Sequence, residues 1–129
     1  MILNLTDLSD ESLQSQISRQ IRAMILAGEL PADSNLPSIR SLARQQHVSV
    51  ITVQRAYEHL LREELIHSRR GKGFFVSELP QYRKKEMAKK RLLENLEHPL
   101  RAALAEGLTS EDIYKLVEII LKKNKRAKK

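Results

Sequence analysis

Residues 36–62 read LPSIRSLARQQHVSVITVQRAYEHLLR, and this stretch holds two helical patterns with a short break between them. Ser38 follows Pro37 and is a good N-cap for the first helix, because its hydroxyl can accept a hydrogen bond from a free backbone N–H. The apolar positions of that helix are Ile39, Leu42 and Ala43. The stretch therefore predicts two short helices in succession.

The second helix is predicted to begin at Ser49, another natural N-cap. Apolar residues recur at the spacing of one buried helix face, namely Val53, Ala56, Tyr57, Leu60 and Leu61. The opposite face is a mixed surface with amide and guanidinium groups, made of Val50, Ile51, Gln54, Arg55 and Glu58. Two such helices are typical of a helix-turn-helix, whose second helix enters a DNA major groove.

The composition limits the classes of protein to consider. A chain of 129 residues with 41% hydrophobic content can bury one modest core plus an appendage. It contains no cysteine, which excludes a disulfide framework and a thiolate nucleophile or metal site. No run approaches the roughly 18 apolar residues of a membrane span, and the first residues lack the basic region and apolar block of a signal peptide. We expect a soluble, cytoplasmic protein with no membrane partner.

The formal net charge of +7 favours an anionic partner, but the charge is unevenly distributed. Residues 1–65 hold six arginines, no lysine and eight acidic residues, for a net charge of −2, whereas residues 66–129 hold 17 basic and eight acidic residues, for +9. Six of the positive charges lie in residues 122–129. This basic C-terminal tail is either a solvated, frayed end or a source of nonspecific attraction for phosphate.

The N-terminal residues predict a strand and a helix. Residues 2–5 alternate weakly and predict a short edge strand. Ser9 or Asp10 is then expected to cap a helix that ends near Gly28. Its apolar positions recur at helical spacing and are Leu13, Ile17, Ile21, Met24 and Ile25. We expect this helix to form part of the core.

Beyond Glu64 the pattern changes to that of strands, with residues 65–68 and 74–76 separated by Gly71-Lys72-Gly73. Two short strands joined by a glycine turn make a β-hairpin, and a hairpin directly after a helix-turn-helix is a wing. Its tip is basic and contains Arg69, Arg70 and Lys72. Either these charges only keep an ordinary hairpin soluble or, as the neighbouring helical pair favours, they contact phosphate or the minor groove.

Two amphipathic helices are expected after the wing. Pro80 should end the first unit and mark a basic linker, and Pro99 should kink or divide the helix that follows, because proline removes a backbone hydrogen bond and clashes with the preceding turn. Gly107 should close that helix. Thr109 and Asp112 have the spacing of a capping box at the start of the last helix.

Two helices of this length cannot bury both of their apolar stripes alone. Either they pack back on the first domain or, as groove reading by a two-fold dimer favours, they pair with the same helices of a second copy. The residues expected at the homodimer interface are Leu93, Leu96, Leu100, Leu104, Ile113, Leu116, Val117 and Ile120. The predicted fold is mainly α with a small β-hairpin, with a winged helix-turn-helix in residues 1–78 and a short helical dimerisation region with a basic tail in residues 79–129.

These motifs together resemble the GntR family of bacterial transcription regulators, and most of all its short YtrA subfamily, over essentially the whole chain. The matching pieces are Gln16-Ile17, residues 36–40 with Leu42-Ala43, Val48-Ser49 with Thr52-Val53 and Ala56-Tyr57, the wing residues 71–76, and residues 107–113 at the start of the last helix. The resemblance implies a homodimeric repressor of its own or a transporter operon, bound to a palindromic operator in double-stranded DNA. It implies no cofactor, and it identifies no small-molecule effector.

Carried over position by position, the DNA contacts of the family fall on Arg40, Ser49, Val50, Ile51, Thr52, Gln54, Arg70 and Gly71. The exposed helix face adds Arg55, and the wing tip adds Lys72. The family commonly has arginine where Val50 and Gln54 stand, and valine can touch only a thymine methyl whereas glutamine suits adenine N6 and N7. The bases preferred by this chain should therefore differ from those preferred by family members with arginine at these two positions. Asp33 and Glu64 also stand where glycines are usual in the loop and before the wing.

Two other classes of protein compete with this interpretation. A metal enzyme would draw on His59 and Glu63, which are one helical turn apart, and on His67. A further ligand, a nucleophile and a glycine-rich phosphate loop are absent from the sequence, so we expect neither catalysis nor a metal. Alternatively, the winged helix serves as a protein or RNA interaction module, because a basic wing and linker suit any anionic partner.

Overall fold

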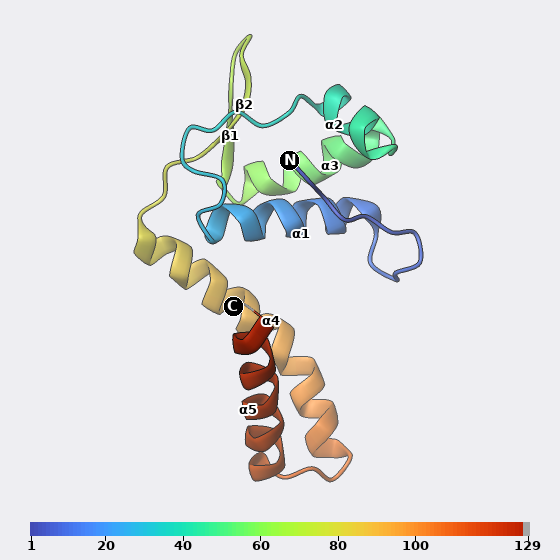
Figure 1. The fold of residues 1–129 in the computed structure, drawn as a ribbon, viewed down its shortest axis with the longest axis vertical. Coiled ribbons are helices and arrows are strands. Elements are labelled where there is room, and N and C mark those ends of the chain that lie inside the picture. Colours follow the sequence, from blue (N-terminus) through green and yellow to red (C-terminus); the bar gives the residue numbers. More distant parts are fainter. Residues whose placement is uncertain (128–129) are drawn as a thin grey trace. The chain divides into compact units, whose positions relative to one another are not determined.

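The computed structural model describes residues 1–127 and separates into two compact units, Met1–Lys85 and Glu86–Lys129. Along the chain the elements are α1 (Leu13–Leu26), α2 (Ile39–Gln46), α3 (Val50–Arg62), β1 (Ile66–Arg69), β2 (Gly73–Val76), α4 (Gln81–Ala105) and α5 (Ser110–Ala127), as Figure 1 shows. The predicted mainly helical fold with one β-hairpin is confirmed. The split between residues 78 and 79 stays a prediction about the domains.

The helical pair forms where the sequence predicts it, because two serines cap its helices. The Ser38 hydroxyl accepts from the Ser41 N–H at 3.1 Å, and the Ser49 hydroxyl accepts from the Thr52 N–H at 3.1 Å. Between the helices, His47 takes the left-handed conformation with φ 57°, which ends α2 and turns the chain into α3. Both predicted N-caps are confirmed.

Helix α3 lies at the centre of the first unit and packs against both α1 and α2 (Figure 1). The Tyr57 hydroxyl donates to the Pro37 carbonyl at 2.7 Å, and its ring meets the Phe74 ring edge-on with centroids 5.0 Å apart. Burial raises the pKa of Tyr57 well above its usual range, so the phenol stays a neutral donor. The buried apolar side chains are Leu3, Ile17, Ile21, Ile25, Leu36, Leu42, Ala43, Val53, Ala56, Tyr57, Leu60, Leu65, Ile66 and Val76.

Helix α1 begins later than predicted. Its N-cap is Ser12, whose hydroxyl accepts from the Ser15 N–H at 3.2 Å, so the expectation of a cap at Ser9 or Asp10 is wrong. The Ser9 hydroxyl instead accepts from the Glu11 N–H at 3.0 Å and closes a local turn. Because the Ser9 hydroxyl accepts this hydrogen bond, it does not cap the helix.

The predicted edge strand at residues 2–5 is also wrong. The side-chain amide of Gln20 accepts from the Asn4 N–H at 2.8 Å and donates to the Asn4 carbonyl at 2.7 Å. Gln16 does the same for Thr6, at 2.9 and 2.8 Å. Two glutamines of α1 thus provide the donors and acceptors that a neighbouring strand would otherwise supply.

A buried ion pair ties α1 to the end of α3. The Arg22 guanidinium meets both oxygens of the Glu63 carboxylate, with Nε at 3.1 and 3.0 Å and Nη2 at 2.5 Å from Oε1. The Arg22 side chain is 6% exposed and that of Glu63 is 27% exposed. The two-point geometry satisfies a cation that would otherwise be costly to bury.

The wing is an antiparallel hairpin in which β1 pairs with β2 from Ile66 opposite Val76 to Arg69 opposite Gly73. A loop segment, residues 33–36, runs along the free edge of β2. There the Asp33 N–H donates to the Val76 carbonyl at 2.8 Å, and the Leu36 N–H donates to the Phe74 carbonyl at 2.8 Å. A third backbone segment therefore lines the base of the wing, beside the two strands of the sheet.

Helix α4 begins at Gln81, directly after Pro80, so the basic segment is helical, and its role as a linker stays a prediction. The helix continues through Pro99, which does not divide it, and a pair between Arg101 and Glu97 spans the proline. The bend expected at Pro99 stays a prediction. As predicted, Gly107 closes the helix, with a left-handed φ of 100°.

The predicted capping box at the start of α5 is confirmed. The Thr109 hydroxyl accepts from the Asp112 N–H at 3.1 Å, while the Asp112 carboxylate accepts from the Thr109 N–H at 2.9 Å. The hydrogen bond from the Thr109 N–H to its carboxylate lowers the pKa of Asp112. The basic tail lies at the end of this helix, and Lys128 and Lys129 fall outside the described residues.

Candidate nucleic-acid interface

The start of α3 presents free donors to the solvent. Ser49 and Thr52 hold each other through their hydroxyl oxygens, 2.8 Å apart, and Ser49 also caps the helix. The first N–H groups of a helix carry a partial positive charge and point outward, which is the arrangement that binds phosphate oxygens. The sequence places Ser49 and Thr52 here, and the structure fixes their hydroxyls at this end.

The exposed face of α3 is the predicted one. Val50 is 45% exposed and Ile51 is 59% exposed. Gln54 is exposed too, and its amide nitrogen lies 3.3 Å from a Glu58 carboxylate oxygen. Contact with a base edge would replace that single long hydrogen bond.

Several cations of the first unit have no partner among residues 1–127. Arg40 lies in the first turn of α2 and Arg55 lies on α3, both exposed and without an ion pair or hydrogen bond to the described residues. By contrast, Arg19 pairs with Glu11 at 2.9 Å. Arg40 and Arg55 are therefore free to meet an external anion.

The wing tip carries two more unpaired cations. Arg70 and Lys72 flank Gly71 in the turn, all three are exposed, and neither cation contacts a described acidic group. Gly71 has φ 75°, a left-handed conformation that glycine adopts without strain. In Figure 1 the hairpin tip projects beyond α1, α2 and α3.

Arg69, one residue earlier, is different. Its guanidinium donates to the Asp33 carboxylate at 2.9 Å, and its Cζ atom lies 4.3 Å from the centre of the Phe75 ring. The three basic residues at this end of the hairpin thus divide into one that is engaged within the protein and two that are not.

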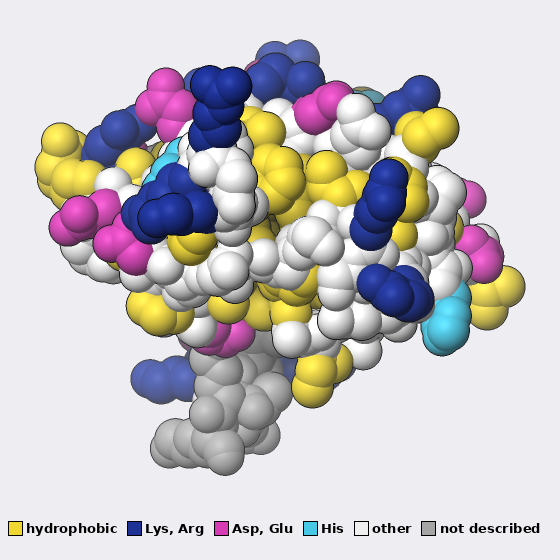
Figure 2. Space-filling model, turned by 90° about the horizontal axis from the view of Figure 1, so that it is seen from above, with side chains coloured by type: hydrophobic (Ala, Val, Ile, Leu, Met, Phe, Trp, Pro, Cys, Tyr) yellow, Lys and Arg dark blue, Asp and Glu magenta, His cyan; other side chains and the backbone are white. Residues whose placement is uncertain are grey.

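Basic side chains stand apart from one another on the face of the molecule seen in Figure 2, with polar and apolar side chains between them. The figure shows no continuous basic patch on that face. Attraction for an anion there depends on where single cations stand more than on total charge.

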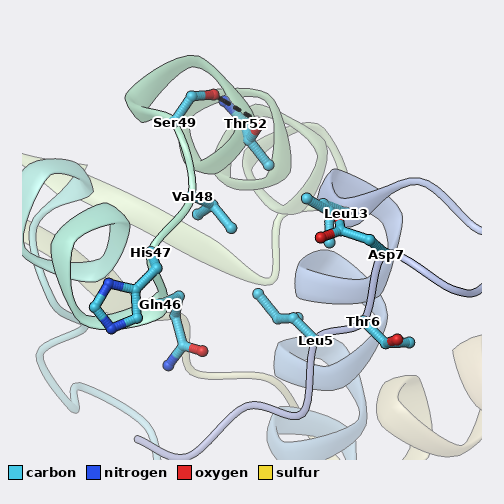
Figure 3. Close-up of a pocket in the computed structure, with 9 residues that line it drawn as sticks. All are labelled: Leu5, Thr6, Asp7, Leu13, Gln46, His47, Val48, Ser49 and Thr52. Carbon is cyan, nitrogen blue, oxygen red and sulfur yellow. Dashed lines mark hydrogen bonds between the residues drawn. The ribbon is translucent and has the colours of Figure 1, made fainter.

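A hollow of about 490 Å³ lies beside the start of α3, open to solvent. Figure 3 shows the N-terminal segment on one side of it and the turn between α2 and α3 on the other. The lining residues are Leu5, Thr6, Asp7, Leu13, Gln46, His47, Val48, Ser49 and Thr52. Ser49 and Thr52 line this hollow and also stand at the start of α3. A molecule bound in the hollow would therefore lie against that end of the helix.

The alternative metal site lacks support in the described part of the chain. Among residues 1–127, no group of three His, Asp or Glu side chains is placed to hold a metal ion. Glu63, the ligand proposed with His59, is occupied by Arg22. His67 faces Ser77, with Nδ1 3.1 Å from the hydroxyl oxygen.

The family model "Bacterial regulatory proteins, gntR family" matches residues 13–76, which span α1 to the end of the wing. The regulator YhcF of Bacillus subtilis is 32% identical over 105 residues, which are 81% of this chain and 86% of that protein. The chain belongs to the GntR family. Members of this family are bacterial transcription regulators and not enzymes, so the helix-turn-helix and wing of this GntR chain form a DNA-binding domain.

Other relatives extend the match to the helices beyond the wing. The repressor YtrA of Bacillus subtilis is 29% identical and shares 94% of this GntR chain and 93% of its own length. The probable rhizopine catabolism regulatory protein MocR of Rhizobium meliloti is 42% identical over 72 residues, but the chain spans only 15% of it. The similarity to MocR thus concerns a domain, whereas the similarity to YtrA concerns most of both chains.

Solved structures agree. A GntR family regulator from Listeria monocytogenes superposes with a TM-score of 0.71 at 28% identity, covering 88% of this chain and 97% of that one. YtrA from Sulfolobus acidocaldarius gives a TM-score of 0.58 at 30% identity, covering 73% and 99%. Within residues 1–127 of this GntR chain, no helix is long and apolar enough to cross a membrane.

Proposed function

We propose that this chain is a transcriptional repressor that binds a palindromic operator as a homodimer, in its own operon or a transporter operon. Its relative YtrA carries the name of repressor, and the match covers nearly the whole of both chains. Bacterial DNA lies in the cytoplasm, and we place the protein there. The observation that carries the proposal is the pairing of a winged helix with two helices whose apolar faces are uncovered.

Those uncovered faces support a homodimer. Leu93, Leu104 and Leu116 are 70%, 52% and 50% exposed, and α4 has no buried residue. Leu96, Val117 and Ile120 are also exposed, and Leu100 and Ile113 are half-buried. Apolar stripes on two neighbouring helices are typical of interfaces between copies, and a two-fold axis would present two α3 helices to two half-sites.

The dimer is tested with Leu96→Glu and its matched control, Asn95→Glu, which places the same charge on the neighbouring exposed position of α4. We expect the first variant to sediment as a monomer and to lose most of its operator affinity, because a charge on the apolar stripe must be desolvated at the interface. The control should remain dimeric. A Leu96→Glu chain that stays dimeric at the same concentration contradicts this interface.

The exposed face of α3 is proposed to read the bases. Val50 and Ile51 offer only apolar contact, which suits thymine methyl groups, and Gln54 suits adenine N6 and N7. Arg55 stands on the same helix, where it can reach a base edge or the backbone. Val50, Ile51 and Gln54 therefore favour A·T pairs at the positions they contact.

The remaining groups are proposed to bind the DNA backbone. Ser49 and Thr52 at the start of α3 hold phosphates together with the free N–H groups of that helix, and Arg40 adds a cation from α2. Arg70, Gly71 and Lys72 of the wing contact phosphate or the minor groove.

Selection of bound fragments from a random DNA pool tests the function as a whole. It yields the preferred site, its symmetry and the half-site spacing together. We expect an inverted repeat with A·T pairs at the contacted positions, bound far more tightly than random DNA at physiological salt. An affinity ratio near one would instead support the interaction module for protein or RNA.

A further inference from the structure

Side chains from three backbone segments hold the wing together. Arg69 comes from β1, Phe75 from β2 and Asp33 from the loop that runs along the outer edge of β2. In the hairpin register Arg69 lies opposite Gly73, and His67 lies opposite Phe75. Since glycine has no side chain, the long side chain of Arg69 has room to lie across β2.

Arg69 uses that room to join the other two segments. Its Cζ atom is 4.3 Å from the centre of the Phe75 ring, the geometry of a cation–π contact, and its Nη2 atom is 2.9 Å from the Asp33 carboxylate. The His67 ring stacks on Phe75 with centroids 6.1 Å apart. We name the set Asp33, Arg69 and Phe75 the wing clamp.

Asp33 itself adopts the left-handed conformation, with φ 67°. A side chain at such a position costs energy that glycine would not incur. Its carboxylate provides a contact that glycine cannot make. The clamp therefore gives a structural reason for an aspartate at this point of the loop.

We propose that the wing clamp sets the orientation of the wing tip and so acts on DNA binding without touching DNA. Arg69 and Asp33 are positioning residues, whereas Arg70 and Lys72 are the contacts. The proposal rests on the DNA-binding role given to the wing above. Because the pair is exposed, with side chains 44% and 62% accessible, it adds little to global stability, and its effect lies in the tip.

The sign of the change in DNA affinity caused by Asp33→Asn distinguishes a positioning role from simple electrostatics. The change removes a negative charge and frees Arg69, so electrostatics alone predicts tighter DNA binding and a steeper salt dependence. Loss of the clamp predicts weaker binding, by about two- to fivefold, because the apparent Kd rises as the competent wing conformation becomes less populated. Asparagine tolerates the left-handed backbone, so the fold is retained.

The matched control is Glu29→Gln, which removes one negative charge from an exposed side chain of the same loop that makes no hydrogen bond or ion pair with a described residue. It should leave the affinity unchanged or raise it slightly. All variants are measured by fluorescence anisotropy on the DNA fragment selected from the random pool, and their thermal unfolding is compared with that of the original chain.

A salt titration then distinguishes Arg69 from Arg70. Arg70→Gln should lower the slope of log K against log salt by about 1, because one phosphate contact is lost. Arg69→Gln should weaken binding about as much as Asp33→Asn and leave the slope unchanged. The double variant should lose no more than either single variant, since both changes break one unit.

Tighter binding by Asp33→Asn, or a slope that falls by about 1 in Arg69→Gln, would overturn the clamp. If the original chain does not prefer any DNA sequence, the proposed function fails and the clamp is measured on the free protein. The Lys72 N–H donates to the Arg69 carbonyl at 2.9 Å across the turn. Hydrogen exchange of the Lys72 N–H should be faster in Asp33→Asn and Arg69→Gln than in Glu29→Gln, and equal exchange rates would refute the clamp.

Discussion

Replacing Glu63 by glutamine should destabilise the first unit more than any comparable surface change. The substitution keeps the shape of the side chain and removes the charge that neutralises Arg22. The Arg22 side chain is 6% exposed, so its guanidinium would remain buried with one neutral acceptor in place of a carboxylate. A buried cation without its partner is costly whether or not the fold adjusts around it.

The magnitude follows from the burial of the two partners. Breaking a buried pair by removing one partner costs about 3–5 kcal/mol, and Glu63 is 27% exposed, so water can reach the site and the loss falls near 3 kcal/mol. For a domain of about 60–100 residues this corresponds to a decrease in Tm of roughly 12–24 °C. That is a large share of the stability of a small domain.

Arg22→Met is the matched comparison. Methionine fills part of the arginine volume, and the Glu63 carboxylate left behind is partly exposed and can be hydrated, so the loss should be about 1 kcal/mol. The double variant should resemble Arg22→Met and not the sum of the two losses. Urea unfolding followed by far-UV circular dichroism, at one protein concentration, measures all three. Equal losses for Glu63→Gln and Arg22→Met would refute the reasoning.

Four further changes have defined outcomes. Arg40→Ala should weaken operator binding by about 1–3 kcal/mol in a gel-shift titration without changing the unfolding curve, since its exposed side chain makes no hydrogen bond or ion pair with a described residue. Glu64→Gly should raise stability by about 0.5–1 kcal/mol, because Glu64 has φ 61°, and Glu64→Ala should not. The hydrogen bond from Arg19 lowers the pKa of Glu11 below 4.5. The pair therefore stabilises the fold above that pH, and this stabilisation is lost as the pH falls through the lowered value. In Arg19→Gln the loss of stability over this pH range should be smaller. The contribution of the pair is small, because the Arg19 side chain is 53% exposed and that of Glu11 is 31% exposed, and acid titration of the two chains side by side measures it. Gln54→Arg should move the preference at one base pair from adenine to guanine in a repeated DNA selection, and an unchanged site would remove Gln54 from the reading face.

Local rules predicted the elements around the reading helix. Helical spacing and two serines defined α2 and α3, and Gly71 and Gly73 defined the wing, because each signal acts within a few residues. The N-terminal segment was mispredicted for the same reason. Its backbone is satisfied by the amides of Gln16 and Gln20, which lie 10 to 16 residues away.

Contacts between distant residues could not be predicted in this way. Arg22 and Glu63 are 41 residues apart, and Arg69 and Asp33 are 36 apart. Charge counting treats all arginines alike, so the sequence placed Arg69 with Arg70 at the basic tip of the wing. Only the packing of the loop against β2 distinguishes the two.

The difference between paired and unpaired arginines explains how a nearly neutral segment can take part in DNA binding. Residues 1–65 carry a net charge of −2, but four of their acidic residues are each paired with an arginine, in the pairs Glu11–Arg19, Glu63–Arg22, Asp33–Arg69 and Glu64–Arg83. Pairing withdraws those arginines from any external anion. The cations left without a described partner include Arg40, Arg55, Arg70 and Lys72, which stand on α2, α3 and the wing tip. The acidic residues therefore determine which cations can reach DNA, and placement matters more than total charge.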